Sequence, residues 1–224
     1  MKDILKFLSR WIIIITLPVL LILTALRLVL TPAFLNIEYR MPGFPADVYG
    51  FSLDDRLYYS TQTYEYLVNP EDISFLEDLR FENGTGIYNE RELSHMEDVQ
   101  VLILLALRVW MGLLIVTVLL VLFMLKVRAH DDLRAGFFWG GWVSVGLVVI
   151  LLLLILIDFD TLFTQFHKLL KFPGDTWLFY SSDTLIRLLP IRFFTDTFIF
   201  VGLFTLVIGL GLGLGLRRKN DLIK

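Results

Sequence analysis

The chain contains no cysteine among its 224 residues. This absence excludes disulfide bonds, thiolate nucleophiles, Cys-ligated zinc sites and iron–sulfur clusters. Histidine is scarce, with three copies, and a formal net charge of −3 gives no basic field of the kind that nucleic-acid-binding proteins carry. The Gly-x-Ser-x-Gly, His-Glu-x-x-His and Walker patterns are also missing. We therefore expect no nucleic-acid partner, and no hydrolase or nucleotide-binding activity of the kinds that these motifs carry.

Long apolar runs are what the chain has in abundance. Hydrophobic residues make up 56% of it and the mean hydropathy is +0.70, above the usual range of soluble domains. Four runs are long enough to cross about 30 Å of hydrocarbon, which takes about 20 helical residues. Backbone groups in lipid must pair within their own segment, so the runs are predicted to be helices. The four runs are Trp11–Leu30, Val99–Leu125, Phe137–Ile157 and Phe193–Leu216.

The placement of basic residues predicts the orientation of these spans. Three short polar pieces on one side of a four-span arrangement, residues 1–10, 126–136 and 217–224, hold half of the 20 Lys and Arg residues. Such loops stay in the cytoplasm. We therefore expect a multi-pass protein of the cell membrane with both termini in the cytoplasm. The first run exceeds a typical signal-peptide core and no small-residue cleavage site follows it at Thr31–Asn36, so an uncleaved anchor is predicted over a signal peptide.

The predicted fold class is an all-α membrane protein, with four transmembrane helices and a small mixed α/β extracellular cap. Spans alternate with the segments that connect them, which divides the chain into eight parts. These parts are a first transmembrane helix with a cytoplasmic N-terminus (1–31), the extracellular cap (32–98), the second helix (99–126), a cytoplasmic loop (127–136), the third helix (137–157), an aromatic outer loop (158–192), the fourth helix (193–216) and a cytoplasmic tail (217–224).

The expected cap carries several local signals. Its first prolines, beginning with Pro32, predict an extended or turning start. Ser52 followed by Asp55 is a variant capping box and predicts a helix that Asn69-Pro70 ends. The residues on either side of Asn83–Gly86 predict a small β-hairpin. A segment of this size is too small for a large core of its own.

Two of the three histidines fall on the expected outer side. His95 precedes the second span and His167 follows the third by about ten residues, whereas His130 lies in a basic cytoplasmic loop and is expected to be solvated. Histidine is the side chain whose pKa lies nearest neutral pH, which suits proton transfer. The two outer histidines either form one site or are separate interfacial residues. Glu92 and Asp98, each three residues from His95, are placed to orient its imidazole or to raise its pKa.

Several further charged residues stand out against their apolar surroundings. Arg27 lies near the outer end of the first span, where its side chain is expected to snorkel to the interface. Arg108 lies deeper in the second span, which favours a buried acidic partner or an anionic lipid headgroup. Asp183 and Arg187, four residues apart in the aromatic outer loop, either assist the second outer histidine or form a helix salt bridge of small worth.

Four stretches of the chain resemble the bacterial lipoprotein intramolecular transacylases. They are Tyr49–Leu57, Tyr88–Val99, Phe166-His167 and Trp177–Phe194, and the most specific parts read His-Met-x-Asp-Val and Asp-x-Leu-Ile-x-x-x-Pro-x-x-Phe-Phe. The resemblance implies an enzyme that moves the sn-2 acyl chain of a diacylglyceryl lipoprotein to the α-amino group of its N-terminal cysteine. It implies His95 and His167 as the catalytic residues at the outer membrane face. No cofactor or metal is expected, and the expected partners are the lipoprotein substrate and membrane lipid.

Six more residues are expected to bind substrate or to support the histidines. These residues are Tyr49, Asp98, Arg108, Trp177, Asp183 and Arg187. Two other classes of function stay open from the residues alone. A membrane hydrolase acting on lipid or lipoprotein would need a nucleophile or an activated water, and a non-enzymatic lipid-binding subunit would need neither histidine. Paired histidines also hold haem, although usually inside the spans.

Overall fold

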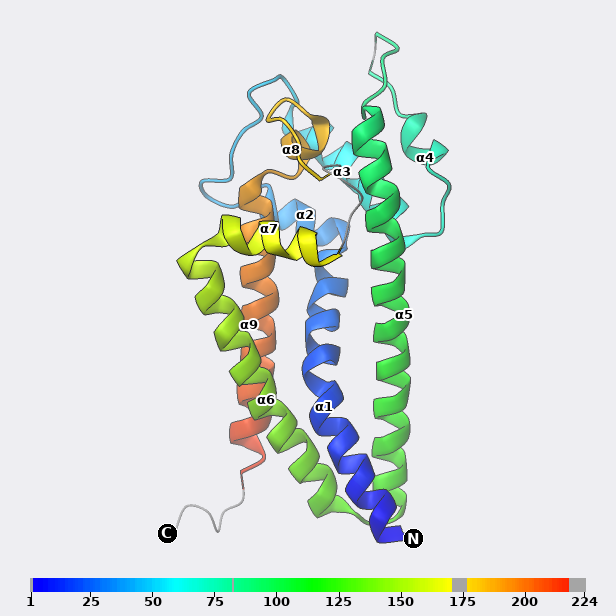
Figure 1. The fold of residues 1–224 in the computed structure, drawn as a ribbon, viewed down its shortest axis with the longest axis vertical. Coiled ribbons are helices and arrows are strands. Elements are labelled where there is room, and N and C mark those ends of the chain that lie inside the picture. The colour runs from blue at the N-terminus through cyan, green and yellow to red at the C-terminus, as the bar shows by residue number, and fades with distance from the viewer. Residues whose placement is uncertain (1, 82, 171–176, 218–224) are drawn as a thin grey trace. The chain divides into compact units, whose positions relative to one another are not determined.

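The computed structural model describes residues 2–81, 83–170 and 177–217 (Figure 1). Helices are the only regular secondary-structure elements in these three ranges, apart from one isolated β-bridge. In chain order they are α1 (Lys2–Val29), α2 (Pro32–Glu38), α3 (Leu53–Val68), α4 (Ser74–Glu77), α5 (Glu90–Lys126), α6 (His130–Ile157), α7 (Phe159–Leu170), α8 (Thr184–Leu188) and α9 (Ile191–Gly215).

Four of the helices, α1, α5, α6 and α9, are long and apolar enough to cross a membrane, with 28, 37, 28 and 25 residues. The four predicted apolar spans are confirmed in this sense of length and composition. At 1.5 Å per residue, α5 is about 55 Å long, well beyond the roughly 30 Å of hydrocarbon in a bilayer. Part of α5 must therefore lie outside the hydrocarbon, and His95 is near its start.

The chain divides into two units, each built from segments that are distant in sequence. The first unit contains Met1–Leu26, Arg108–Ile157 and Ile199–Lys224, which form most of the spans. The second contains Arg27–Leu107 and Asp158–Phe198, and therefore both His95 and His167.

Close backbone contact joins α6 and α9 within the first unit. A Cβ atom added at Gly141 would lie 2.7 Å from the carbonyl oxygen of Gly209, and one added at Gly209 would lie 3.0 Å from that of Gly141. Small residues permit this approach where lipid provides no hydrophobic drive between helices. Gly211 and Gly215 have no such neighbour within 4 Å, so only part of the glycine series in α9 serves packing.

Helix starts in the second unit follow local chemistry. The capping box that predicts α3 is confirmed: the Asp55 amide donates to Ser52 Oγ at 3.1 Å and the Ser52 amide donates to Asp55 Oδ2 at 2.8 Å. The predicted extended or turning start of the cap is wrong at Pro32, because Pro32 is the first residue of α2 and Thr31 caps that helix. The chain does turn directly after this helix, at residues 39–43. Proline at the first helical position has no amide to leave unpaired and its φ suits the helix.

Polar groups tie α2, α3 and α8 together inside the second unit. The Tyr39 hydroxyl donates to the Leu188 carbonyl at 2.6 Å and lies 2.5 Å from Ser60 Oγ. Arg56 is buried, lies 4.7 Å from the centre of the Tyr39 ring and donates to the Pro45 carbonyl at 2.7 Å. Buried polar groups of this kind fix orientation because each one needs its partner.

The predicted mixed α/β character of the cap is wrong for the residues that the structure describes. The chain does turn at Gly84, whose φ of +83° is in the left-handed region, but only one isolated antiparallel bridge forms, between Arg80 and Gly86. The Ile87 amide donates to the Leu79 carbonyl at 3.0 Å beyond it. A ladder this short, without a third strand, lacks the cross-strand contacts that stabilise a sheet.

Candidate active site

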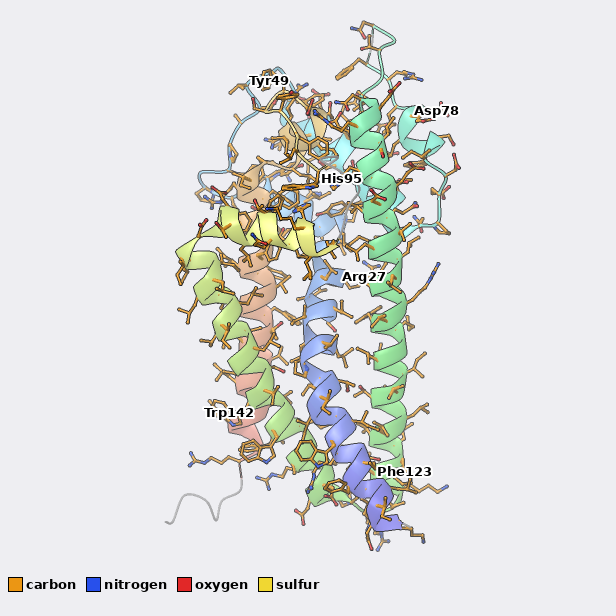
Figure 2. The ribbon with its side chains drawn as sticks, in the orientation of Figure 1. Arg27, Tyr49, Asp78, His95, Phe123 and Trp142 are labelled. Carbon is orange, nitrogen blue, oxygen red and sulfur yellow. The ribbon has the colours of Figure 1, made fainter. Side chains whose placement is uncertain are left out.

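His95 is held near the start of α5 by the structure that begins the helix. The Asn89 amide donates to Glu92 Oε2 at 2.8 Å and the Glu92 amide donates to Asn89 Oδ1 at 3.0 Å, a reciprocal cap. The other carboxylate oxygen of Glu92 accepts from the Leu185 amide at 2.7 Å, which links α5 to α8. Along the long axis of Figure 2, His95 lies between Arg27 and Tyr49.

His167 comes from α7, which runs crosswise to the first turns of α5 (Figure 1). This helix starts where Asp158 accepts bonds from the amide of Thr161 at 2.9 Å and from its hydroxyl at 2.5 Å. His167 Nδ1 lies 2.8 Å from the carbonyl oxygen of Phe163. A carbonyl can only accept, so Nδ1 carries the hydrogen, and in the neutral ring Nε2 is the nitrogen that carries a lone pair.

The structure brings His95 and His167 together. Their ring centres are 6.1 Å apart and the ring planes differ by 28°. Both side chains are buried, with exposed fractions of 8% for His95 and 7% for His167. Seventy-two residues of sequence separate them. An imidazole pair is thus assembled from α5 and α7, and a substrate group reaching one ring lies close to the other.

Burial keeps both imidazoles neutral at neutral pH. Burial, and then the nearby His167, lowers the pKa of His95 to about 4. Burial also lowers the pKa of His167, although its bond to the Phe163 carbonyl acts in the opposite direction. The expectation that neighbouring acids raise the pKa of His95 is therefore wrong. Glu92 is one reason, because its oxygens are committed to backbone amides.

Aromatic side chains cover the imidazole pair. Trp177 stacks on His167, with ring centres 4.9 Å apart and an interplanar angle of 21°. Phe179 places its ring 5.3 Å from that of His95 at 66°. Phe163 lies 4.3 Å from His167 on its own helix. Trp177 is thus in contact with His167, and the site is lined by rings that also suit acyl chains.

The predicted pairing of Asp183 with Arg187 is wrong. Asp183 precedes the first turn of α8, and its carboxylate accepts from Arg91 at 2.6 Å and from the Tyr180 amide at 2.8 Å. Arg187 instead donates two bonds to Asp47, at 3.1 and 2.9 Å. Asp183 therefore holds the loop that carries the aromatic cover, whereas Arg187 ties α8 to the segment around Asp47.

Tyr49 and Arg108, two of the expected supporting residues, are both exposed in the structure. The Tyr49 hydroxyl lies 3.0 Å from Ser181 Oγ, and the ring is half exposed. Arg108 follows His95 by thirteen residues in α5 and is exposed, with no ion pair to any residue that the structure describes. The first unit, which contains Arg108, supplies it with no acidic partner among the described residues, and an acid or a lipid headgroup as its partner stays a prediction.

Arg27 and Asp98 are the two remaining charged residues of interest. The Arg27 guanidinium donates to the Leu30 carbonyl at 3.2 Å, which satisfies it at the end of α1. Asp98 lies one turn beyond His95 in α5. No group of three or more His, Asp or Glu side chains in the described ranges is placed to hold a metal ion.

Comparison with known proteins identifies the family of this chain. The model of the family "Lipoprotein intramolecular transacylase Lit" matches residues 11–194, most of the chain. The chain belongs to this family. As a Lit family member with four apolar helices, it is a multi-pass membrane protein and a lipoprotein intramolecular transacylase.

One relative and two solved structures of another are similar to this Lit family member over nearly its whole length. An uncharacterized protein of Aquifex aeolicus (strain VF5) is 25% identical over 199 residues, which cover 89% of this chain and 88% of the relative. The membrane integral lipoprotein intramolecular transacylase Lit from Bacillus cereus has the same fold, with 21% identity, a TM-score of 0.77, and coverage of 97% and 98% of the two chains. A variant of the Bacillus cereus protein with one histidine replaced by arginine gives a TM-score of 0.71 at 20% identity, covering 100% and 96%.

Arg91 is the residue of this Lit family member that sequence reasoning missed. Its guanidinium lies 5.5 Å from the centre of the Phe179 ring and 5.0 Å from that of Tyr180, and Asp183 anchors it. Arg91 therefore holds the aromatic cover next to His95. Its position four residues before His95, on the same helix face, is the only signal that the sequence offers.

Proposed function

We propose that this transacylase moves the sn-2 acyl chain of a diacylglyceryl lipoprotein to the α-amino group of its N-terminal cysteine. The buried, neutral imidazole pair supports this reaction more than any other feature does. An α-ammonium has a pKa of about 7.7–8.0, so a neutral imidazole close by is a suitable acceptor for its proton. Donor ester and acceptor amine belong to one molecule, and no acyl-enzyme intermediate is needed.

His167 is proposed as the general base. Its Nδ1 hydrogen is donated to Phe163, which directs the Nε2 lone pair away from its own helix turn. The amine nitrogen forms a bond to the ester carbonyl carbon, and the bond from that carbon to the glyceryl oxygen then breaks. Of the two protons that the ammonium loses, one reaches the leaving alkoxide and the other reaches solvent, so the atoms and charges balance.

His95 is proposed to act on the oxygen atoms. Hydrogen-bond donors aimed at a developing oxyanion are commonly the largest single contribution to acyl transfer. His95 accepts a proton less readily than an ordinary histidine, since burial lowers its pKa to about 4. Once it has received one of the two protons that the ammonium loses, it is correspondingly acidic and transfers that proton readily to the alkoxide.

The aromatic cover is proposed to hold the lipid. Folding a flexible diacylglyceryl group until the amine meets the ester costs conformational entropy, and confinement in a fixed site removes that cost from the reaction step. Trp177 and Phe179, which lie against the two imidazoles, form the part of this cover nearest the reacting groups.

Mass spectrometry of a reporter lipoprotein's N-terminal peptide tests the reaction. The reporter is made with and without this protein in a host that has no other N-acylating enzyme. We expect an N-acylated, lyso-glyceryl peptide of unchanged total mass only when the protein is present, and no product when the reporter's α-amine is acetylated. Release of free fatty acid without N-acylation would replace the proposal with a lipoprotein hydrolase.

The site is further proposed to face the outside of the cell, with both termini in the cytoplasm. The skewed distribution of basic residues supports this orientation. Cysteines introduced singly at Thr85 and Ser182 should react with a membrane-impermeant thiol reagent in intact cells, and one at His130 should not. The native chain has no cysteine to interfere. Labelling at position 130 alone would reverse the orientation and leave the proposed reaction unaffected.

A further inference from the structure

Asp98 combines two features that the reaction scheme above does not use. It lies three residues after His95 in α5, a spacing that places Cβ atoms about 5–6 Å apart on one helix face. Its Oδ2 atom is buried and has no hydrogen-bond partner among the residues that the structure describes. A buried acceptor without a partner is costly, on the order of 1–3 kcal/mol, and more when it is charged. A bound ligand would remove that cost.

The cation nearest to Asp98 on the same helix face is already committed. Arg91 lies seven residues before Asp98, close to two full turns of the helix, and its guanidinium is paired with Asp183 at 2.6 Å. His95 and His167 contribute no positive charge at neutral pH because burial lowers the pKa of each. Within the described residues, Asp98 is therefore an acid three residues from His95 in α5 with no ion-pair partner.

We propose that Asp98 binds the α-ammonium group of the lipoprotein substrate and so places the amine beside the two imidazoles. This inference rests on the proposed transacylase reaction. The substrate's ester and acyl chains are uncharged, so the ammonium is the charged group common to all such substrates at the reacting centre. It offers hydrogens to a carboxylate oxygen, and such a charge-assisted bond is about twice as strong as a neutral one.

Asp98 then contributes to binding of the substrate and also affects the pH dependence of the reaction rate. A carboxylate beside the amine stabilises the ammonium, so it raises the pH at which the bound amine loses its proton. His167 is the group proposed to take that proton. Asp98 thus makes deprotonation of the bound amine harder, but it makes the site select substrates that have a free α-amine.

The decisive experiment measures binding without turnover. Two analogues of a diacylglyceryl cysteinyl peptide carry an ether in place of the sn-2 ester. One has a free α-amine and the other an acetylated one. We expect the wild type to bind the free-amine analogue on the order of tenfold more tightly at pH 7, and Asp98→Asn to bind both alike. Glu97→Gln is the matched control, because Glu97 is exposed and adjacent in the helix, and it should keep the tenfold preference.

A pH profile separates substrate binding from a structural role. In single-turnover reactions with the ester substrate, Asp98→Asn should shift the rising limb of the rate to lower pH. A merely structural residue would scale the rate at every pH alike. Asp98→Glu, which keeps the charge, should restore part of the amine preference.

Two results would overturn the inference. One is equal affinity of the wild type for both analogues, which needs no variant and so holds even if Asp98→Asn fails to fold. The other is a tenfold preference that persists in Asp98→Asn. Either result leaves the transacylase reaction standing if the reporter lipoprotein is still N-acylated, whereas absence of N-acylation in the wild type would contradict the proposed function itself.

Discussion

In the first unit, helices α6 and α9 approach until backbone meets backbone at Gly141 and Gly209, and the buried cluster of Ile13, Met124 and Ala129 is apolar. In the second unit, directed polar bonds hold the segments, such as Glu92 to the Leu185 amide and Asp183 to Arg91. Shape complementarity fixes the first and charge-assisted hydrogen bonds fix the second. The site is built where orientation of single side chains is controlled, so substitutions in the two units should fail in different ways.

The largest expected effect falls on the two imidazoles of the second unit. His95→Ala and His167→Ala should each lower N-acylation by about 10²–10⁴-fold, because general acid–base catalysis typically contributes that much. Groups that act in one proton-transfer sequence are non-additive, so the double variant should lose little more than either single one. Product formation by mass spectrometry gives the rates, and membrane insertion should be unchanged.

His130→Ala is the control for the histidine variants. His130 is exposed at the start of α6 in the first unit. Activity should stay within about twofold of wild type, as for surface substitutions generally. If the variant that lacks both His95 and His167 kept near wild-type activity, the claim that the second unit contains the catalytic residues would be contradicted.

Loss of one directed bond in the second unit should come next in size. Glu92 has an exposed fraction of only 1% and accepts from two backbone amides. Glu92→Gln replaces one acceptor with an amide group that faces another donor, at a cost of about 1–3 kcal/mol. We expect a lower unfolding temperature in detergent together with lower activity, since the same side chain links α5 to α8.

Glu90→Gln controls for the change of charge at the start of α5. Glu90 is exposed in the first turn of the same helix. Its variant should lose at most a few tenths of a kcal/mol, the value of a helix-dipole contact at the surface. Equal losses at both positions would show that Glu92 acts through its charge and not through its two bonds.

Packing in the first unit should affect stability without a specific effect on the site. Gly141→Ala places a methyl group 2.7 Å from the Gly209 carbonyl oxygen, so the helices must separate at a cost of about 1–3 kcal/mol. Gly211→Ala meets nothing within 4 Å and should be neutral or slightly stabilising, because alanine favours helix. Unfolding temperatures measured side by side decide this. A Gly141→Ala protein as stable as wild type would mean that backbone contact is not what joins α6 and α9.

The last expected effect, which is absent at neutral pH, is the pH dependence of stability that His95 confers. The folded pKa of about 4 lies below the ordinary value of about 6.5, so between these values the unfolded chain binds more protons than the folded one. The stability that neutral, buried His95 contributes is therefore fully present above pH 6.5 and is lost as the pH falls toward 4. His95→Gln should flatten the decline in unfolding temperature over that window, and His130→Gln should leave it as in wild type.

Local patterns in the sequence determined a large part of the fold. The four apolar helices follow from run length, and α3 follows from Ser52 and Asp55, because hydrogen bonds inside a helix and at its cap involve residues that are neighbours in the chain. The residues of the candidate pair were also within reach of sequence reasoning. His95 and His167 flank spans on the same predicted side of the membrane, and the resemblance to a family of transacylases singles them out.

Tertiary structure alone decided the partners and the charges. Asp183 pairs with Arg91 and not with Arg187, and the predicted hairpin reduces to one bridge at Arg80. The pKa of His95 is lowered where its acidic neighbours predicted the opposite. The physical reason is common to all three. Ion pairing, strand pairing and desolvation depend on which distant segments meet and how much water they exclude, and helical spacing or composition contains neither quantity.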